Sequence, residues 1–440
     1  MAEARATEAA ATSLGTEMEL VVGEMAAGGG CVARAADGRV VFVRHAIPGE
    51  KVRVRVLHET ARYLRADAVA VLEPAPGRVV APCAHAGPLR CGGCDWQHID
   101  LALQRQIKSR LVAEQLRRVA GVDWDLEVEE VPDAPSGLGW RTRVRVAIDE
   151  EGRAGFRRHR SHDLEVIERC GLAAPAVTAL EIAARRWPGA AEVEARAVGG
   201  GEESGLISVT SIRARRPREG SHRPARLWRS ARAPGTGLVV DGEVVEEPGR
   251  QHVVVKGRRF QVSAGSFWQV HVAAPGTLVE AVLEGLAPRA GESAVDLYAG
   301  AGLFSAFLAE RLGEEGSVLA VERDPGACAD AQANTAAFST VTVMRRAVTE
   351  RLIARGIGEP DLVVLDPARE GVGISAMRAL AGLRPAPRRV AYVSCDPASF
   401  ARDLRVLRDQ RWALEHLRGF DLFPMTEHVE LVAFLVPPPS

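Results

Sequence analysis

The stretch Ala294-Val-Asp-Leu-Tyr-Ala-Gly-Ala-Gly-Leu-Phe304 decides the fold of this 440-residue chain. Its first four residues are typical of a buried strand, and a helical segment follows the glycines. Gly300 and Gly302 let the chain turn sharply and let its backbone approach a bound ligand. A strand, a glycine turn and a helix in this order indicate the start of a nucleotide-binding parallel sheet.

The acid that follows this turn indicates the kind of cofactor. Glu322 ends the next expected strand, where a carboxylate can accept hydrogen bonds from both hydroxyls of a ribose. The turn lacks the third glycine of a dinucleotide fingerprint, and Asp296 precedes it. These two features favour S-adenosylmethionine over NAD. A tight structural turn without a ligand is the alternative, and it explains the combination of motifs less well.

Strands and helices alternate from about residue 264 to the end of the chain. A helix is expected over 274–286. This alternation predicts an α/β domain over 264–440, a doubly wound parallel sheet with a late strand pair. The expected strands are 294–297, 318–321, 341–343, 362–365, 390–393 and 431–436.

The first part of the chain has a different pattern. Residues 1–14 are predicted to be a disordered tail without the features of a signal peptide. Over 15–75, apolar and polar residues alternate between glycine-rich turns, which predicts a small antiparallel β-barrel. Residues 76–263 are predicted to form a β-rich central domain. Its clearest elements are a helix near 104–119 and strands at 141–148 and 251–255.

Seven cysteines in a chain without a secretory signal do not indicate a disulfide framework. Cys91-Gly-Gly-Cys94 has the spacing of metal ligands, and Cys83 lies just before it. Cys170 is the best candidate for a fourth ligand, because it is another cysteine in a polar loop. Four thiolates suit either zinc or an iron–sulfur cluster, and the spacing alone does not separate the two.

The charge and the apolar runs of the chain limit the kinds of partner that the protein can bind. The net charge of −1 gives no global basic field. However, basic residues concentrate over 102–118, where Lys108 accompanies four arginines, and arginines concentrate over 211–232, which suits docking of a polyanion such as RNA. The alternative to RNA binding is that these clusters have no binding role, because arginine is the usual basic residue of this chain, which has few lysines. No apolar run is long enough to cross a membrane, so a cytoplasmic protein is predicted, and no obligate protein partner is evident.

Cys395 is the candidate nucleophile. It lies in Ser394-Cys-Asp-Pro397, directly after the expected strand 390–393. Chemistry is usually placed at the carboxyl ends of strands in such a sheet, and a thiolate is a strong nucleophile at neutral pH. The alternative is an inert buried thiol.

Six motifs occur in an order that closely resembles the RNA (uracil-5-)-methyltransferase family, which makes 5-methyluridine in tRNA and ribosomal RNA. The resemblance covers nearly the whole chain. It implies a class I methyltransferase domain, and it likens the predicted barrel to the TRAM domain, an OB-like RNA-binding module. The motifs are Cys91-Gly-Gly-Cys94 with Gln97-His98, Phe267-Trp-Gln269-Val, Asp296-Leu-Tyr-Ala-Gly-Ala-Gly302, Asp366-Pro-Ala-Arg369, Ser394-Cys-Asp-Pro397 and Phe423-Pro-Met-Thr-Glu-His-Val-Glu430.

The resemblance also implies roles for single residues. It makes Cys395 the nucleophile and Glu430 the base that accepts a proton. It implies contacts to S-adenosylmethionine from Gln269, Tyr298, Glu322 and Asp366, beside the turn of Gly300 and Gly302. It implies a 4Fe–4S cluster on Cys83, Cys91, Cys94 and Cys170. Cys83 departs from the pattern, because seven residues separate it from Cys91, more than is common in that family. Val348-Thr349 stands where many such enzymes carry an acid on the adenine side, so no adenine contact is assigned.

The chemistry explains these residue types. Uracil C5 is too poor a nucleophile to attack a methyl sulfonium unaided, but addition of a thiolate at C6 makes C5 reactive. A base must then remove the C5 proton so that the thiol can leave. Two alternatives are a cytosine-5 RNA methyltransferase, which usually has two motif cysteines, and a non-catalytic RNA-binding or RNA-folding protein. As the target, the barrel and the four cysteines favour 23S ribosomal RNA over tRNA.

Overall fold

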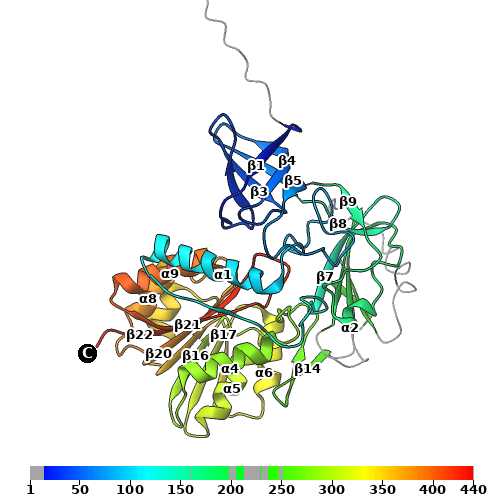
Figure 1. The fold of residues 1–440 in the computed structure, drawn as a ribbon. Coiled ribbons are helices and arrows are strands. Elements are labelled where there is room, and N and C mark those ends of the chain that lie inside the picture. Colours follow the sequence, from blue (N-terminus) through cyan, green and yellow to red (C-terminus); the bar gives the residue numbers. More distant parts are fainter. Residues whose placement is uncertain are drawn as a thin grey trace, which may run out of the picture. The chain divides into compact units, whose positions relative to one another are not determined.

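The computed structural model describes residues 14–159, 161–197, 205–212, 228, 236–246 and 251–439. Most of the arginine-rich stretch 211–232 therefore lies outside the described residues. The chain divides into two compact units (Figure 1). The first contains the residues up to Gln104 together with short segments around Arg158 and at Met425–Glu427, and the second contains the rest.

The first unit is built on a five-stranded sheet in the order β1-β4-β5-β3-β2. On β4, Val52, Val54 and Val56 are buried, whereas the arginines between them face out and pair with glutamates of β1. This alternation is the one that predicted the barrel strands. Figure 1 shows the curled sheet in blue. Its strands are β1 (Glu17–Val21), β2 (Cys31–Arg34), β3 (Val40–Arg44), β4 (Lys51–Glu59) and β5 (Tyr63–Glu73).

Two details of this sheet differ from the sequence prediction. β3 and β5 run parallel, so the sheet is not purely antiparallel. The short strand β2 was not predicted, because it directly follows three consecutive glycines at 28–30 that mask its apolar residues. The β4–β5 pair contains register shifts, and such bulges increase the local twist that curls a sheet.

The second unit contains a seven-stranded sheet in the order β13-β12-β11-β10-β7-β8-β9. Trp187 and Trp228 are fully buried in its core. The predicted strands at 141–148 and 251–255 are present as β7 and β14. The sheet strands are β7 (Arg143–Ile148), β8 (Ala154–Arg157), β9 (Leu164–Val166), β10 (Ala190–Arg196), β11 (Leu206–Ser211), β12 (Gly237–Val240) and β13 (Glu243–Glu246); a short helix α2 (Pro175–Thr178) and the hairpin of β14 (Gln251–Val255) and β15 (Arg258–Val262) complete this part.

The same unit contains an eight-stranded sheet in the order β18-β17-β16-β19-β20-β22-β21-β6. The five strands from β18 to β20 are parallel, and β22 is antiparallel to both β20 and β21. The predicted doubly wound sheet with a late strand pair is therefore confirmed. The strands are β16 (Ser293–Leu297), β17 (Ser317–Glu322), β18 (Val341–Arg345), β19 (Leu362–Leu365), β20 (Arg389–Ser394), β21 (Ala413–Phe420), β22 (Glu430–Val436) and β6 (Val128–Glu129).

Helices cover both faces of this sheet (Figure 1). On β19, Val363 and Leu365 point into one core and Leu362 and Val364 into the other, which explains the continuous apolar runs of the parallel strands. The first core contains side chains from η1, α8 and α9, and the second contains side chains from α4 and α5. The helices are α1 (Leu101–Gln115), η1 (Leu116–Ala120), α4 (Ala274–Leu286), α5 (Leu303–Leu312), α6 (Pro325–Thr335), α7 (Glu350–Gly356), α8 (Ile374–Ala381) and α9 (Pro397–Asp409).

A buried ion pair ties α1 to the segment after β21. Lys108 is 0 % exposed, and its Nζ lies 2.6 Å from Asp421 Oδ1 and 3.0 Å from the Phe423 carbonyl oxygen. Lys108 is therefore not part of an exposed basic surface, although it contributes to the basic run counted over 102–118. This is a correction to that run. Its side chain holds in place the segment that leads into β22.

Replacing Lys108 by methionine is expected to lower the free energy of unfolding by about 3–5 kcal/mol, because Asp421 would remain buried without its partner. Chemical denaturation measures this loss. Arg117→Met, at an exposed position of η1, serves as the control and is expected to change stability by less than about 0.5 kcal/mol. Equal stability of the Lys108 variant and the control would show that the pair contributes nothing.

Candidate functional site

The glycine turn joins β16 to α5 at the carboxyl edge of the parallel sheet. Tyr298, Gly300 and Gly302 have φ angles of 67°, 54° and 81°, so the turn has left-handed backbone conformations that glycine adopts without strain. A Cβ on Gly302 would lie 3.2 Å from the Cα of Ala331 on the next helix. The second glycine therefore allows the turn to pack closely against α6.

Glu322, at the end of β17, lies directly across this turn. Its Oε2 accepts a hydrogen bond from Gly300 N at 3.0 Å. Its Oε1 accepts from the backbone nitrogens of Arg323 and Asp324, at 2.6 and 2.8 Å. The carboxylate is thus held beside the turn by hydrogen bonds from three backbone nitrogens.

Asp296 and Asp366 carry carboxyl groups at the ends of neighbouring strands, and Asp296 is buried whereas Asp366 is partly buried. Asp296 Oδ2 accepts from Ser305 Oγ at 2.6 Å, and burial raises its pKa to about 7. Burial also raises the pKa of Asp366 to about 7, and the charge of Asp296 adds to this effect. Gln269 Nε2 lies 3.3 Å from Asp366 Oδ2. The carbonyl oxygen of Gln269 accepts from Thr142 Oγ1 at 3.1 Å, which fixes that segment.

Cys395 and Glu430 come together through strand register. Ser394 of β20 pairs with Leu431 of the antiparallel strand β22. Cys395 follows Ser394 and Glu430 precedes Leu431, so the two residues lie opposite each other, one step beyond this last pair of the ladder. Glu430 is 4 % exposed and Cys395 is half-buried. The register thus explains how two residues far apart in the sequence share one site.

The protonation of this pair depends on burial and on neighbouring charges. Burial raises the pKa of the Cys395 thiol to about 12, with a further contribution from the Glu430 carboxylate. The Arg369 guanidinium acts in the opposite direction and lowers it. Burial, followed by the charge of Asp366, raises the pKa of Glu430 well above its ordinary value. A carboxylate in this environment is a stronger base than one in water.

Two further residues of the site received no role from the sequence. Arg369 Nη2 lies 3.4 Å from His428 Nε2, so the loop after β19 meets the segment before β22. Burial and the charge of Arg369 lower the pKa of His428 to about 4, which keeps its ring neutral at physiological pH. Both residues belong to motifs that carry the family resemblance, but only their spatial meeting indicates a shared function.

The four cysteines proposed as metal ligands do not form a metal site among the described residues. Cys83, Cys91 and Cys94 belong to the first unit and Cys170 to the second. Cys94 Sγ accepts from Gln97 Nε2 at 3.0 Å, and none of these four cysteines forms a disulfide among the described residues. Within the described ranges, no group of three or more His, Cys, Asp or Glu side chains is arranged to hold a metal ion.

Among the helices of the described residues, none is both long and apolar enough to span a membrane. Comparison with known proteins identifies the first unit. A family model described as the TRAM domain matches residues 11–69. This region contains β1 to β4 and most of β5.

Comparisons over the whole chain give relatives with similar names. An uncharacterized RNA methyltransferase of Streptomyces avermitilis is 46% identical, and the match covers 96% of this chain and 99% of the relative. The 23S rRNA (uracil(1939)-C(5))-methyltransferase RlmD of Pseudomonas putida is 32% identical, with 93% and 92% covered. The crystal structure of Pyrococcus abyssi tRNA (uracil-54, C5)-methyltransferase with S-adenosyl-L-homocysteine has a TM-score of 0.70 at 22% identity, with 95% and 99% covered.

Proposed function

The chain belongs to the RNA (uracil-5-)-methyltransferase family, and we propose that it transfers a methyl group from S-adenosylmethionine to C5 of a uridine in RNA. The observation that carries this proposal is the register of β20 and β22, which places Cys395 and Glu430 opposite each other just beyond the last pair, Ser394 and Leu431. A nucleophile and a buried base are the two groups that this reaction requires. The TRAM match supports RNA as the partner.

Cys395 and Glu430 act in sequence in the proposed mechanism. The Cys395 thiolate adds to C6 of the uracil, and the electron pair of the C5–C6 bond becomes available at C5. C5 forms a bond to the methyl carbon while the sulfonium sulfur leaves with its bonding pair. Glu430 removes the proton on C5, the double bond forms again, and the bond between C6 and Sγ breaks. No step requires an external oxidant or reductant, because each bond that forms is matched by a bond that breaks.

The proposed cofactor site lies at the carboxyl edge of the parallel strands. Glu322 would accept hydrogen bonds from the ribose hydroxyls, because its carboxylate is fixed beside Gly300. The backbone of Tyr298, Gly300 and Gly302 would pass close to the cofactor. Gln269 and Asp366, which contact each other, would bind near its methionine end. S-adenosylmethionine supplies the electrophilic methyl group to this site.

The target base must leave its stack to reach a buried pair, and this requirement favours a loop or another unpaired region of RNA. We propose 23S ribosomal RNA as the target, and tRNA is the competing possibility. The support is the full-length similarity to the Pseudomonas putida enzyme, whose name specifies 23S rRNA. The Pyrococcus abyssi protein of similar fold, whose name specifies tRNA, has the lower sequence identity.

A methyl-transfer assay tests the proposed function. The protein would be incubated with S-adenosylmethionine that carries a labelled methyl group and with total RNA from a strain that lacks the gene. We expect label in 5-methyluridine, at one position of 23S rRNA, and no transfer to RNA from the parent strain. Label in 5-methylcytidine would support the cytosine-5 alternative. RNA binding without transfer would support the non-catalytic alternative.

The four cysteines are proposed as ligands of an iron–sulfur cluster on the sequence alone, and no step of the reaction depends on it. We expect protein purified without oxygen to be brown and to contain about four iron atoms per chain. Cys170→Ala is expected to lose most of the iron, whereas Cys328→Ala, at a buried position on α6, is expected to keep it. A colourless protein with one zinc ion would contradict the cluster.

A further inference from the structure

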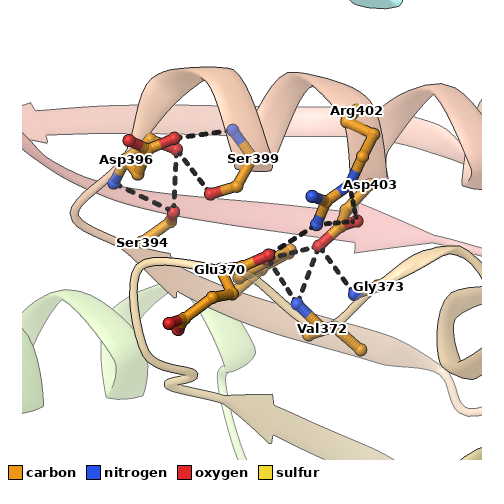
Figure 2. Close-up of polar contacts among 9 residues, drawn as sticks. Glu370, Val372, Gly373, Ser394, Asp396, Ser399, Arg402 and Asp403 are labelled. Atoms are coloured by element: carbon orange, nitrogen blue, oxygen red, sulfur yellow. Dashed lines mark hydrogen bonds and ion pairs between the residues drawn. The ribbon is translucent and has the colours of Figure 1, made fainter.

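A fully buried carboxylate outside the proposed catalytic pair gathers an unusual number of hydrogen bonds. Asp403, on α9, is 0 % exposed. Its Oδ2 accepts from Val372 N at 2.8 Å, from Gly373 N at 3.3 Å and from Tyr392 Oη at 2.8 Å. Its Oδ1 accepts from Arg402 Nε at 2.9 Å and Nη2 at 2.8 Å. Figure 2 shows this carboxylate between the helix and the loop.

These bonds join three elements that carry parts of the proposed site. Tyr392 lies on β20, three residues before Cys395. Val372 and Gly373 end the loop that follows β19, and Arg402 Nη2 binds the carbonyl oxygen of Glu370 in the same loop at 2.7 Å. Asp403 itself lies on α9, which begins immediately after the Cys395 segment.

Hydrogen bonds also fix the start of α9. Asp396 caps the helix, because its side chain accepts from Ser399 N at 2.7 Å. Ser394 Oγ lies 3.3 Å from the Asp396 carbonyl oxygen (Figure 2). Cys395 is thus held between the end of a strand and a capped helix. A change in the position of α9 would therefore be expected to move Cys395.

The loop approaches the carboxylate so closely that it has no room for a side chain. Gly371 has a φ angle of 74°, and a Cβ there would lie 2.6 Å from Asp403 Oδ2 and 2.8 Å from Arg402 Nη2. Such distances require Asp403 or the loop to move. Gly371 therefore provides a way to disturb this contact from the loop side, without changing the buried carboxylate.

We propose that Asp403 is a positioning residue for methyl transfer, which ties the loop that carries Asp366 and Arg369 to the helix that begins beside Cys395. This proposal rests on the function proposed above. The geometry supports it: one carboxylate bonds to the loop, to β20 through Tyr392 and to its own helix. Asp403 touches neither base nor cofactor in this scheme. It acts through the residues whose separation it fixes.

The expected consequence involves the charges around Cys395. Glu430 comes from β22, Asp396 from the start of α9, and Asp366 and Arg369 from the loop after β19. Burial and then the three carboxylates raise the pKa of the thiol, whereas the Arg369 guanidinium lowers it. If the loop moves away when Asp403 is changed, Arg369 and Asp366 both move with it, and the charge of Arg369 has the larger effect of the two on the thiol pKa. The thiol pKa then rises, so less thiolate is present at a given pH.

Asp403→Asn tests the proposal, with Asp409→Asn at an exposed position of the same helix as the matched control. We expect kcat for methyl transfer to fall about 10–100-fold, because a small displacement of a reacting group lowers the rate by a factor of this size. We also expect alkylation of Cys395 by iodoacetamide at pH 8, followed by mass spectrometry, to slow about tenfold, with its pH profile displaced to higher pH. The control is expected to match wild type in both measurements.

Gly371→Ala keeps the proposal testable if the Asp403 variant does not fold. It is expected to reduce kcat and slow Cys395 alkylation in the same direction. A folded Asp403 or Gly371 variant with a lower melting temperature but wild-type kcat and alkylation profile would show a merely structural role and overturn the proposal. The alkylation readout needs no RNA. It therefore tests the positioning role separately from the proposed function. If the proposed function were wrong, Cys395→Ala would instead retain methyl-transfer activity.

Discussion

Replacing Cys395 by alanine is expected to lower kcat for methyl transfer by about 10⁴-fold or more, because removal of an attacking nucleophile leaves only binding contributions. Without addition to C6, C5 of uracil has no electron pair to direct at the methyl carbon. Binding of RNA and of S-adenosylmethionine should change little, since the alanine removes a single sulfur from a half-buried position. Single-turnover transfer of labelled methyl, with separate binding titrations, measures both effects.

The matched control for this variant is Cys31→Ser. Cys31 is fully buried in the first unit, where its Sγ lies 3.4 Å from the Ala46 carbonyl oxygen, and a serine hydroxyl can donate to the same oxygen. We expect this variant to transfer methyl groups at the wild-type rate. Transfer by Cys395→Ala at the rate of the control would refute the covalent mechanism and leave only the fold assignment.

The sequence was sufficient for the parallel sheet. Its inner strands are buried on both faces and appear as short apolar runs, whereas the edge strand β18 has no buried residue. Every one of the six strands expected after residue 264 is present. β21 was not predicted, because Ala413–Phe420 lies near the sheet edge and carries His416 and Arg418 among its apolar residues. β6 was also missed, since a two-residue strand from upstream leaves no periodic signal.

The site could be predicted only in part, for a physical reason. Motifs named Cys395, Glu322 and Glu430, because each lies at the end of an apolar run or within a run that resembles the family. The roles of Arg369, His428 and Asp403 depend on which strands pair and in which register, and periodicity does not contain that information. The position of Lys108 also depends on packing. Its charge alone predicted an exposed basic surface, whereas the side chain is buried and paired with Asp421.

Replacing Glu430 by glutamine is expected to stop the reaction after methyl transfer rather than before it. The amide keeps the shape of the buried side chain but cannot accept the proton on C5, so the bond between Cys395 and C6 cannot break by elimination. A methylated covalent complex of protein and RNA should therefore accumulate, while turnover falls about 10²–10⁴-fold. Denaturing gel electrophoresis with label in the methyl group detects this complex.

The same substitution makes a prediction of opposite sign for the thiol. The Glu430 carboxylate is the largest charge contribution that raises the pKa of Cys395. The neutral amide removes that contribution, so thiolate forms at lower pH and iodoacetamide should alkylate Cys395 faster than in wild type at pH 8. Glu415→Gln, on the exposed part of β21, should show neither effect. A variant with both a more reactive thiol and a trapped adduct would separate two roles of Glu430. The charge of Glu430 opposes formation of the Cys395 thiolate in the first step, and its basicity drives removal of the C5 proton in the last step.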